Sequence, residues 1–74
     1  GRWMRAMFFD DGFKVIEDRR RGIVEAYDLL ADPGELDNQF EPSDPRMQDR
    51  LMQLRSFFAA HALKKPGYKL PYRP

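Results

Sequence analysis

The sequence contains no cysteine and no threonine, a single histidine, and only two serines, Ser43 and Ser56. Without cysteine, the chain cannot form a disulfide framework, a zinc ribbon, an iron–sulfur site or a thiol nucleophile. With one histidine, it has almost no material for a histidine metal site or a Ser-His-Asp triad. We therefore expect no catalytic residue, no metal site and no cofactor site in this chain.

Long apolar runs and a strong charge of one sign are also missing. No purely apolar run exceeds four residues, whereas about 20 are needed to cross a bilayer, so we expect no membrane span. Arg2, Arg5 and the Asp10-Asp11 pair interrupt the start of the chain, which argues against a signal peptide there. The net charge is +1, and this near-neutral balance argues against a dedicated nucleic-acid binder.

The length of 74 residues suits one small domain. A chain of this size buries only about 60% of the surface that it exposes when unfolded. Little room is left for both a core and an enclosed active site.

The first third of the chain has the pattern of three short strands. They cover residues 2–9, 13–18 and 23–29, with turn signals at residues 10–12 and 19–22. The Asp11-Gly12 pair supplies the positive φ that a tight hairpin needs. Because short connections force antiparallel pairing, we expect a meander of three strands, to which the tail or a partner could add a fourth.

A turn-rich connection over residues 31–42 leads to one long predicted helix over residues 44–63. Ser43 or Asp44 suits its N-cap, and Pro45 suits its first position. Apolar residues at steps of three and four form one helical face: Met47, Leu51, Leu54, Phe58 and Ala62. The predicted fold is therefore α+β, a small antiparallel sheet of three to four strands packed with one long C-terminal helix. We assign residues 1–63 to this subdomain and residues 64–74 to an extended, proline-rich tail.

Both faces of the first predicted strand are largely apolar. Met4, Ala6 and Phe8 share one face, and Trp3, Met7 and Phe9 share the other. One helix covers only one face of a small sheet, so we expect the face with Trp3 and Phe9 to stay uncovered. That face is predicted to pack on a domain outside this chain or, in isolation, to drive self-association, with pairing of an edge strand as the alternative route. Serine at both positions should favour the monomer.

Residues 26–38, AYDLLADPGELDN, contain a spaced motif. It reads Tyr-Asp-Leu, two residues, Asp-Pro, one residue, Glu, two residues, Asn, and is made by Tyr27, Asp28, Leu29, Asp32, Pro33, Glu35 and Asn38. The segment resembles the C-terminal segment of sulfatases in the alkaline phosphatase superfamily. An upstream strand with Arg5, a strand with Lys14 and a following helix extend the resemblance to residues 2–63. Ala26 and Gln39 depart from it, because the family usually has leucine at both positions.

The resemblance implies the small C-terminal subdomain of a sulfate ester hydrolase, non-catalytic by itself. It would complete the parent fold by packing on the catalytic domain, and could edge the substrate cleft or support oligomer contacts. The family's Ca²⁺ ligands and its formylglycine, made within a Cys/Ser-x-Pro-Ser-Arg motif, are not in this sequence, so we expect no turnover from the chain alone. Trp3, Arg5 and Lys14 are candidate interdomain contacts. The alternative is a free-standing protein-interaction module with the same sheet and helix.

Other charged groups also have two interpretations. The acidic residues of the motif suggest a Ca²⁺ loop, but EF-hand spacing is absent. We favour turn chemistry, in which Asp32 accepts backbone N–H groups and Asn38 caps the turn or adopts a left-handed conformation. Residues 19–21, three arginines, are more typical of a solvated turn than of an anion site. His61 has no catalytic partner at helical spacing, and Lys14 either reaches an anionic group of another domain or lies along the sheet.

Overall fold

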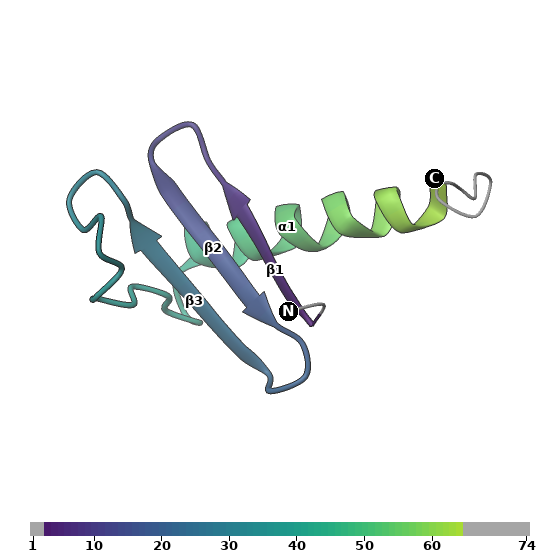
Figure 1. The fold of residues 1–74 in the computed structure, drawn as a ribbon, viewed down its shortest axis with the longest axis horizontal. Helices are drawn as coiled ribbons and strands as arrows, with labels where there is room; N and C mark the ends of the chain where they lie inside the picture. The colour runs from purple at the N-terminus through teal and green to yellow at the C-terminus, as the bar shows by residue number, and fades with distance from the viewer. Residues whose placement is uncertain (1–2, 65–74) are drawn as a thin grey trace.

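The structure of the protein, a computed structural model, describes residues 3–64, with the side chains of residues 3–61. It contains β1 (Met4–Phe8), β2 (Phe13–Asp18), β3 (Ile23–Asp28) and α1 (Pro45–Lys64). The strands form one antiparallel sheet in the order β1-β2-β3, and α1 crosses one face of it (Figure 1). The predicted α+β class is confirmed, with three strands in the described residues. The tail beyond Lys64 lies outside the described residues.

Two glycines with positive φ close the turns of the meander. At the first turn, the N–H of Phe9 donates to the carbonyl of Phe13 at 2.8 Å, and Gly12 has a φ of 92°. A three-residue hairpin loop that ends on a left-handed residue has this geometry. At the second turn Gly22 has a φ of 70°, and the Asp18 carboxylate accepts the backbone N–H groups of residues 20 and 21. Both turns lie where the sequence predicts them.

The start of α1 is fixed by an aspartate cap. Asp44 Oδ1 accepts the backbone N–H of Arg46 at 2.9 Å, which satisfies one of the free N–H groups at a helix start. Pro45 occupies the first helical position, where a missing N–H has no cost. Of the two predicted caps, Asp44 is the one used, while the Ser43 hydroxyl donates to the Glu41 carboxylate.

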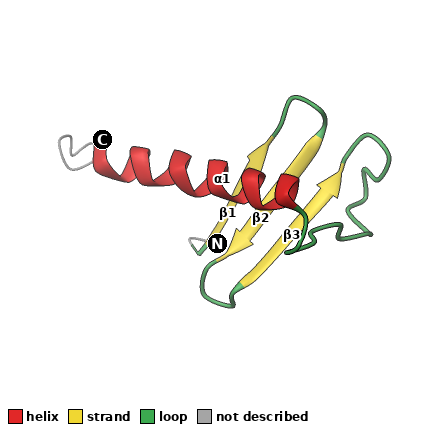
Figure 2. Cartoon of the chain, turned by 180° about the vertical axis from the view of Figure 1, so that it is seen from behind, coloured by secondary structure: helices red, strands yellow, loops and turns green. Residues whose placement is uncertain are grey.

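The hydrophobic core lies between α1 and one face of the sheet, which we call the helix face (Figure 2). Its buried cluster consists of Val15, Ala26, Met47 and Leu54. Partly buried apolar side chains surround this cluster: Met7, Phe9, Phe13, Val24, Phe40 and Phe58. The predicted helical stripe is confirmed from Met47 to Phe58, while the side chain of Ala62 lies outside the described ones. Among the described residues, no helix combines the length and apolar character needed to cross a membrane.

Two arginines of α1 tie the helix to the sheet. The Arg50 guanidinium lies 5.0 Å from the ring centroid of Phe9 and 4.6 Å from that of Phe13. It also donates to the Asp11 carboxylate, which holds the pKa of Asp11 below its ordinary value. Arg55 pairs with Glu17 of β2 at 2.7 Å. Together these contacts fix which side of the β1–β2 hairpin faces α1.

Candidate functional site

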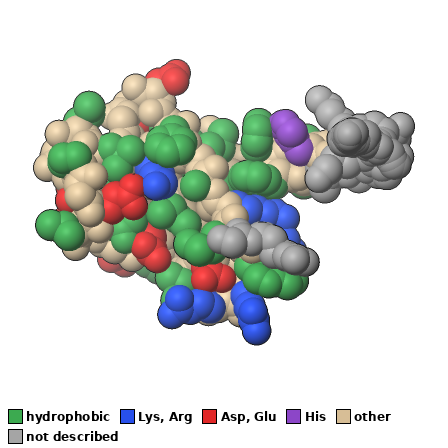
Figure 3. Space-filling model, in the orientation of Figure 1, with side chains coloured by type: hydrophobic (Ala, Val, Ile, Leu, Met, Phe, Trp, Pro, Cys, Tyr) green, Lys and Arg blue, Asp and Glu red, His purple; other side chains and the backbone are tan. Residues whose placement is uncertain are grey.

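The sheet face opposite α1, which we call the open face, has no element over it in the described part of the chain (Figures 1 and 3). Its side chains are those of Met4, Ala6, Phe8, Lys14, Ile16, Asp18, Ile23, Glu25 and Tyr27. Met4 is 47% exposed, Phe8 65% and Ile23 38%. This face therefore presents large apolar side chains to the surroundings.

The prediction that Phe9 belongs to the uncovered face is wrong. Phe9 packs against the core on the helix face, where Arg50 of α1 lies over its ring. Residues alternate along a strand, so the neighbouring Phe8 points to the open face. The large apolar residues of β1 that stay exposed are consequently Met4 and Phe8.

The candidate interdomain residues do not lie together. Lys14 is on the open face, where its Nζ is 2.8 Å from Glu35 Oε2 and 5.4 Å from the ring centroid of Phe8. Arg5 is on the helix face, with its guanidinium carbon 5.1 Å from the ring centroid of Phe58. Trp3 precedes β1 and is half-exposed. Lys14 and Arg5 therefore point to opposite sides of the sheet.

The acidic side chains of the motif bind backbone N–H groups. The carboxylate of Asp32 accepts the N–H of Leu36 at 3.0 Å and that of Asp37 at 2.9 Å. Asp28 accepts the N–H of Leu30 in the same way, at 3.1 Å. These are the contacts that turn chemistry predicts for Asp32. Within residues 3–61, no group of three or more His, Cys, Asp or Glu side chains is placed to hold a metal ion.

The left-handed residue of this turn is Glu35, with a φ of 55°, rather than Asn38. A left-handed conformation costs a residue with a side chain about 1–2 kcal/mol. The Glu35 carboxylate pairs with Lys14 of β2, and this contact offsets part of that cost. The pair also ties the motif turn to the open face, a link that sequence reasoning did not find.

Asn38 covers the outer edge of β3. Its Oδ1 accepts the backbone N–H of Ala26 at 3.0 Å and that of Phe40 at 2.9 Å. The N–H of Gln39 donates to the carbonyl of Ala26 at 2.8 Å. Asn38 and its neighbour therefore bind both outward groups of Ala26, in the middle of this edge, so a further strand cannot pair there and the edge is closed at Ala26.

Nothing in residues 3–64 pairs with the outer edge of β1. The N–H of Phe9 donates to the Phe13 carbonyl, and the N–H of Arg19 donates to the Trp3 carbonyl. Hydrogen-bonded pairs alternate along an antiparallel ladder, so the odd-numbered residues of this segment bind β2. The N–H and C=O groups of Met4, Ala6 and Phe8 consequently point away from the sheet, and no described group binds them.

Because of Tyr27, the stability of the fold is expected to depend on pH in the alkaline range. Its hydroxyl donates to the Glu25 carboxylate, which together with burial raises the pKa of Tyr27 to about 12. The ordinary value in an unfolded chain is about 10. The pKa of Tyr27 is higher in the folded chain than in the unfolded chain. The contribution of neutral Tyr27 to the free energy of unfolding is therefore complete below pH 10 and is lost as the pH rises through 12.

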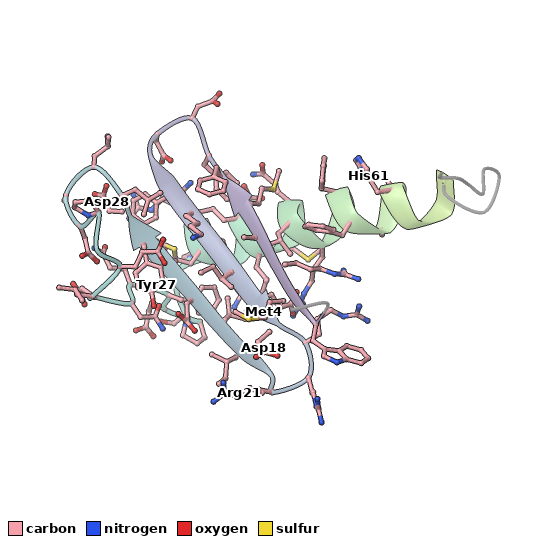
Figure 4. The ribbon with its side chains drawn as sticks, viewed as in Figure 1. Met4, Asp18, Arg21, Tyr27, Asp28 and His61 are labelled. Atoms are coloured by element: carbon pink, nitrogen blue, oxygen red, sulfur yellow. The ribbon has the colours of Figure 1, made fainter. Side chains whose placement is uncertain are left out.

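We therefore expect the melting temperature, followed by circular dichroism, to fall between pH 10 and pH 12. The fall should be smaller in Tyr27→Phe, which has no phenol to ionise. Figure 4 shows Tyr27 on β3, apart from His61, which lies on the part of α1 that projects past the sheet. Identical pH profiles for the two proteins would show that Tyr27 is not coupled to folding.

In comparisons with family models, with curated proteins and with solved structures, no match to this chain was found.

Proposed function

We propose that this chain is the C-terminal subdomain of a sulfatase-like sulfate ester hydrolase, non-catalytic by itself. In this role it completes the fold of the catalytic domain. It also forms part of the rim of the substrate cleft or supports oligomer contacts. The observation that supports the proposal most is the seven-position motif from Tyr27 to Asn38. Its order and spacing, between a strand pair and a helix, are those of the family's C-terminal segment.

The contacts of the motif give its residue types a physical reason. Asp32 holds the turn through backbone N–H groups, Glu35 joins the turn to β2 through Lys14, and Asn38 covers the edge of β3. A motif with these roles builds a scaffold and performs no chemistry. Such a role is expected of a subdomain that packs on a neighbouring catalytic domain.

The open face supplies the second support. Burying a large apolar side chain contributes about 1.5–3 kcal/mol, and Met4, Phe8 and Ile23 are all available for this. A face of this kind is suited to packing on a second domain. In the proposed parent protein, that domain is the catalytic one.

The reading frame that encodes this chain tests the proposal. We expect it to include a domain with a Cys/Ser-x-Pro-Ser-Arg motif and Asp/Asn ligands for Ca²⁺. The longer protein should hydrolyse 4-nitrophenyl sulfate, and the 74-residue chain should not, even with Ca²⁺. A frame without such a domain would contradict the proposal, and so would turnover by the purified 74-residue chain.

In isolation, the chain is expected to self-associate through the open face. Light scattering should show an apparent mass that rises with concentration for the unmodified chain. The double variant Met4→Ser and Phe8→Ser should stay monomeric, because it removes two exposed apolar side chains from this face. A matched control is Leu30→Ser and Leu36→Ser, since both leucines are more exposed but lie on the loop after β3. Equal masses for the two double variants would contradict the assignment.

A free-standing protein-interaction module is the second candidate. It is favoured by the same exposure of Met4 and Phe8, because an apolar open face suits a partner protein as well as a second domain. The two candidates differ in the reading frame, which has no catalytic domain in the second case.

A further inference from the structure

The two edges of the sheet differ in their readiness to bind another chain. On β3, the outward groups of Ala26 are bound by Asn38 and Gln39. On β1, the outward groups of Met4, Ala6 and Phe8 have no partner among the described residues. Proteins usually protect such an edge with charge, proline or a covering element. None of the three residues whose backbone groups point outward is charged or proline. The one charged residue of β1, Arg5, lies on the helix face over Phe58, so the backbone of this edge stays available to one more strand.

Helix α1 provides a platform beside this edge. It passes under β1 and continues beyond it to Lys64 (Figures 1 and 2). Phe58 is half-buried where the helix passes Arg5, and Phe57 packs edge-on against it with ring centroids 5.3 Å apart. A strand added next to β1 would therefore lie over the projecting part of α1 instead of being exposed on both faces.

Arg5 indicates the charge of the added strand. It is half-buried and forms no ion pair within residues 3–61, because Glu17, its cross-strand neighbour, is paired with Arg55. A residue directly opposite Arg5 on a new strand would have its Cβ atom about 5 Å away. An acidic side chain there would give Arg5 a partner on the helix face, beside the ring of Phe58.

A second copy of this chain is a poor occupant of the same edge. Antiparallel pairing of two β1 strands around Ala6 would place both helices on the same side of the joint sheet. In this pairing Met7 of the second copy would lie opposite Arg5, so Arg5 would again have no acidic partner. The better occupant is an extended strand that carries an acidic residue at this position.

We propose that the outer edge of β1 binds an extended segment of another protein, antiparallel to β1, with an acidic side chain set against Arg5. The segment pairs with the backbone of Met4, Ala6 and Phe8, and its alternate apolar side chains extend the open face. This inference does not rest on the sulfatase proposal. It depends only on the closed edge of β3, the unpaired edge of β1 and the position of Arg5.

The probe is the capped peptide Thr-Ile-Thr-Val-Glu-Ile-Thr, designed so that valine lies opposite Ala6 and glutamate opposite Arg5. Titration of the ¹⁵N-labelled chain should give saturable amide shifts centred on Met4, Ala6 and Phe8, with little change at Ala26. The same peptide N-methylated at valine and both isoleucines should not bind, because these are the N–H groups that face β1. Shifts centred on Ala26, or no saturable shift at β1, would overturn the proposal.

Charge exchange tests the role of Arg5. Arg5→Glu should weaken binding about fivefold, and a peptide with lysine in place of glutamate should restore it. Arg46→Glu is the matched control, because Arg46 is exposed at the start of α1 and, among the side chains of residues 3–61, pairs only with Asp44 at 3.6 Å. Equal binding of the glutamate and lysine peptides to the unmodified chain would overturn the assignment of an acidic partner.

Ala6→Pro tests the edge from the side of the protein. The Ala6 N–H points away from β2, so proline removes a donor from the edge without breaking the ladder. We expect this variant to keep a folded amide spectrum and to lose peptide binding. A folded Ala6→Pro chain that binds like the unmodified one would overturn pairing at β1, and the N-methylated peptide decides the same point if the variant does not fold.

Discussion

Replacing Leu54 with alanine is expected to lower the free energy of unfolding by about 2–5 kcal/mol. Leu54 is 0% exposed and belongs to the buried cluster with Val15, Ala26 and Met47. Removing its side chain leaves a cavity between α1 and the one face of the sheet that the described part of the chain covers. Small domains are stable by only about 5–15 kcal/mol. The variant should therefore unfold at a much lower urea concentration than the unmodified chain, in titrations followed by circular dichroism at 222 nm.

Met52→Ala is the control for Leu54→Ala. Met52 belongs to the same helix but is 58% exposed, and exposed substitutions usually change stability by less than about 0.5 kcal/mol. If both variants unfold at the same urea concentration, the claim that α1 packs on the helix face through Leu54 is wrong.

Replacing Asn38 with alanine is expected to cost about 1–3 kcal/mol, the usual penalty for a buried donor without an acceptor. Ala26 is fully buried, and Asn38 Oδ1 is the acceptor of its outward N–H. The measurement is again the urea midpoint, together with the amide shift of Ala26.

Two further variants isolate the side chain of Asn38. Asn38→Asp keeps an oxygen at the same place and should retain most of the stability. Gln39→Ala should have little effect, because Gln39 contributes its backbone N–H. A loss for Gln39→Ala as large as that for Asn38→Ala would contradict the edge-capping role.

Local signals in the sequence predicted most of the fold. Gly12 and Gly22 mark the turns because only a residue without a side chain adopts positive φ at little cost. Asp44 and Pro45 mark the helix start for equally local reasons. The apolar stripe from Met47 to Phe58 then identifies the buried face of α1. Each of these features depends on residues close together in the sequence.

The face of β1 that meets the helix was not predictable in this way. Both faces carry large apolar residues, so alternation alone does not rank Phe8 against Phe9. The choice depends on Arg50, which lies over Phe9 and reaches Asp11 from 39 positions away. In the sequence, Arg50 lies on the polar side of the helical pattern, where a side chain is expected to be exposed to solvent.

The candidate site was predictable in part. Asp-Pro and Asn residues in a short connection indicate turn chemistry, and Asp32 has that role. The binding of Asn38 to Ala26, 12 residues away, depends on how the loop returns along β3. The ion pair between Glu35 and Lys14 depends on the same path of the loop along the sheet. No pattern within the motif itself indicates either contact.

Amide hydrogen exchange tests the central claim most directly, namely that one edge of the sheet is closed by the motif and the other is open. We expect the Ala26 amide to exchange slowly and the amides of Met4, Ala6 and Phe8 to exchange rapidly, although all belong to one sheet. In Asn38→Ala, the protection of Ala26 should fall while that of the β1 amides stays unchanged. Slow exchange at Ala6, or rapid exchange at Ala26 in the unmodified chain, would contradict the claim.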